Sequence, residues 1–224
     1  MCGRFVITSP PAALRQIFGY IEQPNFPPRY NIAPTQPVPV VILENGGRHF
    51  RLMRWGLIPS WVKDPRKFTL LINARSETVL EKPAFKNAIK RRRCLIPADG
   101  YYEWQDAGGR KRPFFIHRRD GKPVGFAALA ETWMGPNGEE TDSVAIVTAP
   151  ASRDLGSHPE RRDHRVRPRA AGAGEVVRGP VVRARAHDRE PERHVHRRIA
   201  ERVEELHRHE PLVVVAGDER VPRA

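Results

Sequence analysis

The chain has 224 residues, of which 39% are hydrophobic and 29% charged, a balance that suits one packed domain with or without an extension. No apolar run approaches the roughly 18 residues of a membrane-spanning helix, and the N-terminus lacks a secretory signal, so we expect a cytoplasmic protein with no membrane partner. Two distant cysteines, Cys2 and Cys94, exclude a disulfide framework. The formal net charge of +13 favours nucleic acid as a partner, although charge alone fits a solvated basic surface equally well.

Short strands separated by Gly, Pro and Asn turns dominate the first 150 residues. The pattern predicts a strand at residues 2–8 and then a helix at 10–18, with Ser9 as its cap and a proline in its first turn. A second short helix is predicted at 83–90. Further strands are predicted at residues 38–43 and 49–55, which form a hairpin, and at 94–98, 101–105, 113–117, 124–130 and 143–148. We therefore predict a single α+β domain with a curled antiparallel sheet or open β-barrel and a few short helices.

The composition changes abruptly near residue 151. All Trp, Phe, Tyr, Lys, Asn and Gln residues precede this point, and Arg, Ala, Gly and Val dominate the rest of the chain. Such a segment buries little apolar area, so we predict a domain at residues 1–157 and a poorly ordered, Arg-rich tail at 158–224. Within the tail, the pattern predicts a short helix at 197–208 and one strand at 212–215.

Cys2 could carry chemistry that no internal cysteine can perform. Initiator methionine is removed efficiently when the next side chain is small, and removal of Met1 would leave an α-amine and a thiol on adjacent carbons. An α-amine with a pKa near ~7.7 is partly neutral at physiological pH and condenses with aldehydes. The thiol of the same residue can then close a five-membered thiazolidine ring. From Met-Cys alone, a small buried hydrophobe is the commoner role.

Residues 92–104 predict two strands joined by a tight turn at 98–100. Glu103 falls among aromatic residues, where desolvation would raise its pKa and suit it to proton transfer. The alternative is a carboxylate that faces water on an edge strand. Cys94 is most simply a core residue.

A polar string at residues 73–78 follows three apolar residues and indicates functional groups at a strand end. There Arg75 could hold a phosphate, or the segment could be a loop in which Ser76 caps a helix. Trp55 and Trp61, close to Arg54 and Lys63, are the materials of a stacking platform for unpaired bases. Tryptophans in a small protein are more often core residues.

Together these segments resemble the SOS response-associated peptidase family, also called abasic-site processing proteins. The motifs that carry the resemblance are Met-Cys-Gly-Arg-Phe at the start, Arg-Tyr-Asn-Ile-Ala-Pro-Thr at 29–35, Arg-Trp-Gly-Leu-Ile-Pro-Ser-Trp at 54–61, Asn-Ala-Arg-Ser-Glu-Thr at 73–78 and Arg-Cys-Leu-Ile-Pro-Ala-Asp-Gly-Tyr-Tyr-Glu-Trp at 93–104. Residues 126–133 and 145–148 continue the match. The resemblance covers about the first 157 residues.

The resemblance implies that the N-terminal cysteine joins the ring-opened sugar of an abasic site in single-stranded DNA as a thiazolidine. Cys2 would be the nucleophile, Glu103 would move protons, and Asn73 would hold the Cys2 backbone or the sugar. The DNA groove would be lined by Arg4, Asn31, Trp55, Trp61 and Arg75. It further implies a monomer with no cofactor and no metal, and the peptidase label would correspond to removal of Met1, which the protein itself could perform.

The family also has a histidine, in a His-x-Arg-Met-Pro motif, that stabilises the linkage or catalyses its reversal. His158 falls at the matching distance, but the Ile, Met and Pro of the motif are absent and the family's later segments are missing. The composition shift motivates the hypothesis that the chain leaves its ancestral reading frame near His158, as an alternative frame of a GC-rich gene would encode. Resequencing the gene tests this hypothesis.

Two other functions compete with covalent lesion binding. A thiol peptidase could use Cys2 with Glu103 and a histidine, although no separate Cys-His signature is present. A non-enzymatic binder of single-stranded nucleic acid would need only the basic surplus and the aromatic residues.

Overall fold

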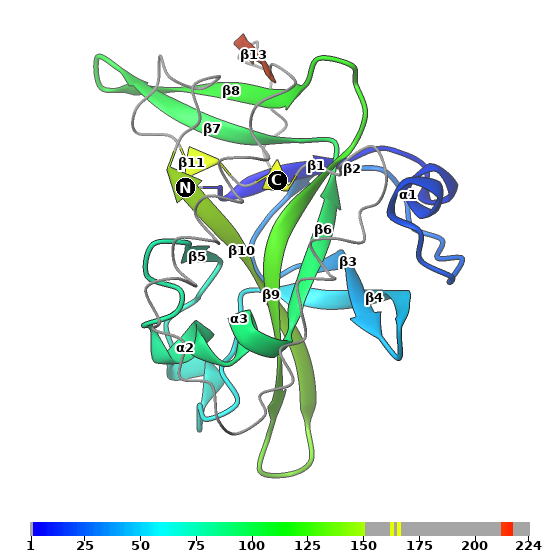
Figure 1. Ribbon diagram of the computed structural model, residues 1–224. Helices are drawn as coiled ribbons and strands as arrows, with labels where there is room; N and C mark the ends of the chain where they lie inside the picture. Colours follow the sequence, from blue (N-terminus) through cyan, green and yellow to red (C-terminus); the bar gives the residue numbers. More distant parts are fainter. Residues whose placement is uncertain (1, 151–161, 164, 167–211, 217–224) are drawn as a thin grey trace, which may run out of the picture.

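A computed structural model describes residues 2–150, 162–163, 165–166 and 212–216. Figure 1 shows two sheets, a barrel in the lower part of the view and a smaller sheet above it. Short helices lie at the margins of this body. The predicted α+β fold class is confirmed, and the predicted sheet curls far enough to close.

Five strands form the barrel: β3 (Pro37–Glu44), β4 (Gly47–Trp55), β6 (Arg93–Ala98), β9 (Val124–Met134) and β10 (Glu140–Pro150). Their order is β10-β4-β3-β6-β9, and β9 also pairs with β10, which closes the ring. All neighbours are antiparallel except β4 and β10, which are parallel with Arg54 opposite Ser143. Closure removes the exposed strand edges that an open sheet would present.

A second sheet contains β1 (Arg4–Ile7), β2 (Arg29–Ile32), β7 (Gly100–Ala107), β8 (Arg110–Arg118) and β13 (Leu212–Ala216), in the order β13-β8-β7-β1-β2. Only Asp99 separates β6 of the barrel from β7 of this sheet. The Asp99 carboxylate accepts hydrogen bonds from the backbone N–H groups of Thr8 and Ser9 at 2.5 and 2.8 Å. Asp99 therefore ties the end of β1 to the corner at which the chain changes sheets.

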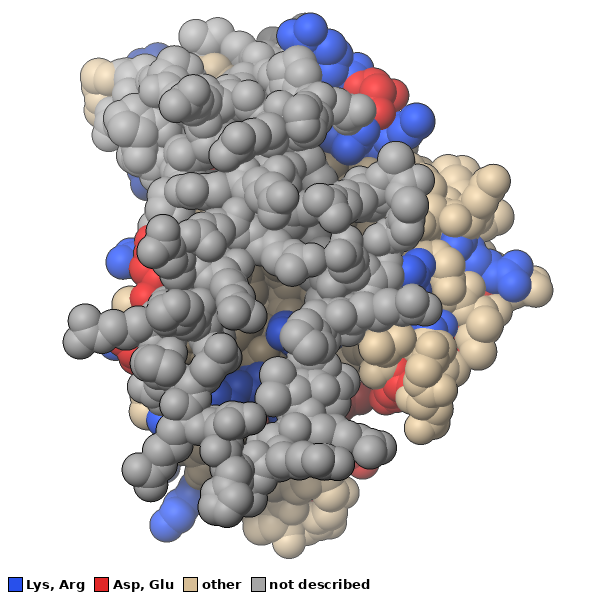
Figure 2. All heavy atoms as spheres, viewed as in Figure 1, with Lys and Arg blue, Asp and Glu red and all other residues tan. Residues whose placement is uncertain are grey.

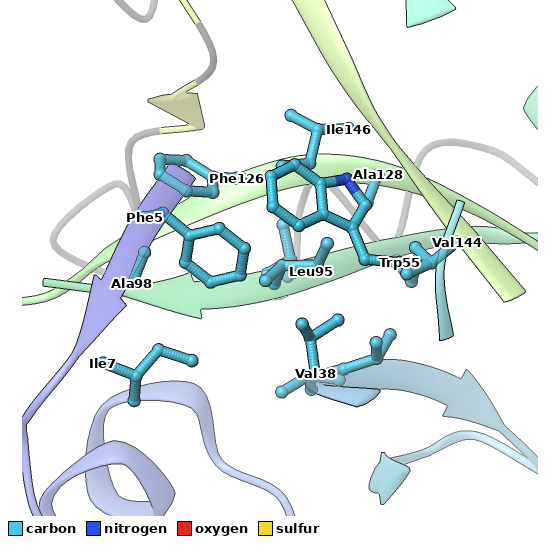
Figure 3. Packing of buried hydrophobic residues seen from close by; sticks show 14 of the residues in the cluster. Phe5, Ile7, Val38, Trp55, Leu95, Ala98, Phe126, Ala128, Val144 and Ile146 are labelled. Atoms are coloured by element: carbon cyan, nitrogen blue, oxygen red, sulfur yellow. The ribbon is translucent and has the colours of Figure 1, made fainter. Parts of the chain in front are cut away.

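The inner face of the second sheet packs on the barrel. Phe5 of β1 lies edge-on to Trp55 of β4, with ring centroids 5.0 Å apart, and to Phe126 of β9 at 5.7 Å. Figure 3 shows these rings beside Leu95 and Ile146. All five side chains are buried, so one core joins the two sheets and fixes the start of β1 relative to the barrel.

The remaining elements are α1 (Pro11–Phe18), η1 (Pro65–Lys67), β5 (Asn73–Arg75), α2 (Pro83–Lys86), α3 (Ala88–Arg91), β11 (Arg162–Asp163) and β12 (Arg165–Val166). The helix predicted at 10–18 is confirmed as α1, but its predicted cap is wrong. Pro10 occupies the N-cap position and its side chain has no polar atom to cap the helix, while the Ser9 hydroxyl donates to Asp99. The helix predicted at 83–90 is two short helices, since Asn87 interrupts it.

Three short strands in the C-terminal region pair with the sheets. The strand predicted at 212–215 is confirmed as β13, which pairs with β8, while β11 and β12 pair with β10 and β9. The predicted helix at 197–208 lies outside the described residues. The predicted boundary at residue 157, the order of the tail and the reading-frame hypothesis stay predictions.

Candidate functional site

Cys2 lies two residues before the start of β1, the strand between β2 and β7 in the second sheet. Arg4 is opposite Tyr102 in the antiparallel pair of β1 and β7. The segment that precedes Arg4 therefore lies toward the part of β7 that follows Tyr102. Cys2 is fully buried and belongs to the main hydrophobic core, and Glu103 is only 6% exposed. Cys2 and Gly3 lie outside the strand, so the ladder does not set the direction of the Cys2 side chain, but the thiol and the Glu103 carboxylate are both buried.

Asn73 reaches the same place from the barrel side. It begins β5, which pairs in parallel with β10 so that Asn73 lies opposite Ile146. Its side-chain Nδ2 donates a hydrogen bond to the backbone carbonyl oxygen of Cys2 at 3.0 Å. The site is therefore assembled from segments far apart in the chain, at the junction of the two sheets.

The surroundings of Cys2 keep its thiol protonated. Burial raises the pKa of the thiol well above its ordinary value, and the negative charge of Glu103 raises it further. The thiol points toward the Arg4 carbonyl oxygen at 3.8 Å, a long and weak contact. The charge of Glu103 therefore acts on the Cys2 thiol, which puts this carboxylate in the neighbourhood of Cys2.

The three polar residues predicted to face DNA lie on strands around this site. Arg4 of β1 donates from Nη1 to Asn31 Oδ1 of β2 at 3.0 Å, so these two predicted residues are brought together. Arg75, two residues after Asn73 on β5, is exposed. Successive strand residues alternate in direction, so Asn73 and Arg75 share one side of β5.

The two predicted stacking tryptophans have opposite environments. Trp61 is 57% exposed and its ring lies edge-on to Phe68 at 5.5 Å, which leaves ring surface open to solvent. Trp55 is fully buried, so its predicted place in a DNA groove is wrong. Trp55 instead donates from Nε1 to the Ile72 carbonyl oxygen at 3.0 Å and thereby holds the residue before Asn73.

Sequence reasoning missed this supporting role of Trp55 and the exposure of Trp104. Trp104 is 38% exposed although its neighbour Glu103 is buried, because neighbouring residues of β7 point to opposite faces. The alternation of residues 101–104 was the available signal.

The remaining expectations concern His158, metal binding, membrane-spanning helices and the two cysteines. His158 lies outside the described residues. Within residues 2–150 and the three short C-terminal stretches, no group of three or more His, Cys, Asp or Glu side chains could hold a metal ion. In the same part of the chain, none of the helices has the length and apolar character needed to cross a membrane. Cys2 and Cys94 are both free and buried.

Comparison with known proteins gives relatives that share one description. The "Abasic site processing protein YoqW" of Bacillus subtilis (strain 168) is 36% identical over 152 residues, which are 66% of this chain and 68% of the relative. "Abasic site processing protein YedK" of Escherichia coli (strain K12) is 37% identical over 143 residues, 64% of this chain and 62% of the relative. "Abasic site processing protein HMCES" of Gallus gallus is 31% identical over 198 residues, covering 69% and 59%.

Solved structures share the fold. A Bacteroides thetaiotaomicron protein superposes with a TM-score of 0.75 at 21% identity, over 97% of this chain and 93% of the other. A phage-related protein of Bordetella bronchiseptica has a TM-score of 0.57 at 31% identity, over 73% and 76%. The sequence model described as "SOS response associated peptidase (SRAP)" matches residues 1–171. The chain therefore belongs to the SOS response associated peptidase family.

Proposed function

We propose that, after removal of Met1, Cys2 links covalently to the aldehyde of an abasic site in single-stranded DNA through a thiazolidine. The observation that carries this proposal is the hydrogen bond from Asn73 Nδ2 to the Cys2 carbonyl oxygen, which fixes the first residues of the chain beside buried Glu103. The names of the bacterial and vertebrate relatives support abasic sites as the substrate.

The chemistry begins at the liberated amine of Cys2. Its lone pair attacks C1′ of the ring-opened sugar, and loss of water from the adduct leaves an imine. The thiol sulfur then adds to the imine carbon while the thiol proton passes to the nitrogen, so the net reaction releases one water. Because both nucleophiles belong to one residue, the second step is intramolecular and is favoured by proximity.

Glu103 is placed to move protons in this sequence. A protonated thiol is a poor nucleophile, and the raised pKa of Cys2 means that its proton must leave as the C–S bond forms. A buried carboxylate next to the thiol can accept that proton and return it to nitrogen. Asn73 holds the backbone of the reacting residue, and His158 would stabilise the linkage or assist its reversal.

The polar and aromatic residues around the site suit an unpaired strand. Arg4 and Arg75 supply positive charge for phosphates, Asn31 orients Arg4, and Trp61 offers a ring on which a base can stack. In Figure 2, Lys and Arg exceed Asp and Glu over the coloured part of the face shown, in keeping with the net charge of +13. This basic surface supports a polyanionic partner.

The structure favours neither competing function. A thiol peptidase activates its cysteine with a histidine; of the described histidines, His49 bonds to Glu22 and His117 to the Arg118 carbonyl oxygen, and His158 lies outside the described residues. A non-enzymatic binder would not need a buried carboxylate beside its second residue. Self-removal of Met1, which the peptidase label suggests, is part of the proposal.

The test incubates the protein with single-stranded DNA that carries one abasic site and resolves the products on a denaturing gel. The wild type should give a heat-stable, slower-migrating band, and Cys2→Ala and Cys2→Ser should both lose it. Cys94→Ser is the matched control, since Cys94 is also buried and free but lies inside β6, and it should retain the band. Mass spectrometry of the isolated protein determines whether Met1 is absent, and a covalent band from Cys2→Ala would refute the proposal.

A further inference from the structure

The hairpin of β7 and β8 extends beyond the body of the protein. Figure 1 shows it running across the top of the molecule, with its turn projecting past the barrel on the side where the N-terminus is marked. The turn consists of Gly108 and Gly109, whose φ angles of 63° and 84° are the positive values that a type I′ turn requires at both central positions. This tight two-residue turn fixes the register of the strands and therefore the face on which each side chain lies.

The face that carries Glu103 continues to the tip of this hairpin. Phe114 is opposite Glu103, and Arg110, four residues from Phe114 on β8, lies on the same face because strand residues alternate with a period of two. The exposed fraction of the side chains rises along the face, from 0% at Ile116 and 6% at Glu103 to an exposed Arg110. The Glu103 face thus emerges into solvent as it approaches Arg110.

Lys111 provides a natural comparison, because it is adjacent, also basic and also exposed. It lies four residues from Phe115, which is opposite Tyr102, and so it belongs to the other face of the hairpin. Among the residues whose side chains the structure describes, none forms an ion pair with Arg110 or Lys111. Of these two basic residues, Arg110 is the one that shares a face with the site.

We propose that Arg110 binds a backbone phosphate of the DNA strand as that strand leaves the site along the Glu103 face of the hairpin. Four strand residues span about 13 Å, which corresponds to about four phosphates at ~3.4 Å and to fewer in an extended strand. An arginine at that distance would hold the nucleotides that flank the lesion on one side. This inference rests on the function proposed above and adds a flank-binding position to it.

The test measures binding to single-stranded DNA that contains a tetrahydrofuran site, which has no aldehyde and cannot be crosslinked. Arg110→Gln should weaken binding and reduce the slope of log K against log salt by about 0.7, the value for one lost single-strand phosphate contact. Lys111→Gln should leave both quantities at the wild-type values, and Arg110→Lys should restore most of the slope. Equal effects of Arg110→Gln and Lys111→Gln, or no effect of either, would overturn the inference.

Oligonucleotides trimmed to one nucleotide on the 5′ or the 3′ side of the lesion locate the contact. The difference between wild type and Arg110→Gln should disappear with one trimmed substrate and persist with the other, and persistence with both would also overturn the inference. Crosslinking of the wild type to a true abasic site is measured in parallel. If the wild type does not crosslink, the proposed function is wrong. If the wild type crosslinks normally but Arg110→Gln binds DNA as the wild type does, only this inference is wrong.

Discussion

Asn73 Nδ2 lies 3.0 Å from the carbonyl oxygen of Cys2, although 71 residues separate them in the chain. The bond joins a strand paired with the barrel to the segment that leads into the second sheet, so it fixes the position of the Cys2 backbone. Asn73→Leu removes the donor at similar volume. A hydrogen bond contributes about 0.5–1.5 kcal/mol, so crosslinking should slow by roughly twofold to tenfold.

Time courses of covalent product at saturating DNA measure this effect. Asn73→Asp is the second variant, and it should slow the reaction more, because it places a carboxylate against the Cys2 carbonyl oxygen. Unchanged rates in both variants, with the fold intact by circular dichroism, would show that the bond does not position Cys2.

Glu103→Gln should lower the pKa of the Cys2 thiol and yet slow crosslinking. The charge of Glu103 raises the pKa of the Cys2 thiol, so Glu103→Gln should lower that pKa while burial still holds it above its ordinary value. The same change removes the proposed proton acceptor and should reduce crosslinking by about 10²-fold or more. Thiolate absorbance titrated in a Cys94→Ser background measures the pKa, and gel assays across pH measure the rate. A variant with faster crosslinking would identify thiolate formation, not proton transfer by Glu103, as the limiting factor.

The sequence predicted the local elements well because their signals are local. Turn residues, alternation and prolines mark α1 and most strands of both sheets. Closure of the barrel and the parallel pairing of β4 with β10 depend on contacts between distant segments, which no local pattern encodes. The predicted cap of α1 was wrong for the same reason, since the Ser9 hydroxyl donates a hydrogen bond to Asp99, which is distant in the chain.

The candidate site divides in a similar way. Motif resemblance identified Cys2, Asn73 and Glu103, and the fold brings these three residues to one junction. It could not distinguish Trp55 from Trp61, because burial depends on the packing of Phe5 against one ring and not the other. Composition near a tryptophan says little about which side of a sheet its ring will occupy.

Substitution of Trp61 should therefore weaken DNA binding, whereas substitution of Trp55 should lower the stability of the fold. Trp61→Ala removes an exposed ring and should weaken binding to single-stranded DNA by about 1–3 kcal/mol, the usual value of one stacked base, with little change in thermal stability. Trp55→Ala leaves a cavity in the core and should destabilise the fold by about 3–5 kcal/mol. Fluorescence anisotropy and denaturant melts measure the two quantities. A large loss of stability in Trp61→Ala, or a loss of affinity in a folded Trp55→Phe, would contradict this division.

The two buried thiols should make the protein less stable in alkali. Burial raises the pKa of both Cys2 and Cys94 far above the ordinary value of ~8.5, so above that pH the unfolded chain loses thiol protons that the folded chain retains. The unfolded state then binds fewer protons, and stability must fall as pH rises, by about 1.4 kcal/mol per pH unit for each thiol. Lysine and tyrosine side chains ionise in a similar range, so the useful quantity is the difference between wild type and Cys94→Ala. Cys94→Ala should cost stability at pH 7, and that cost should shrink between about pH 9 and 10.5 in urea melts. A constant difference across this range would mean that the Cys94 thiol ionises as readily inside the barrel as in water.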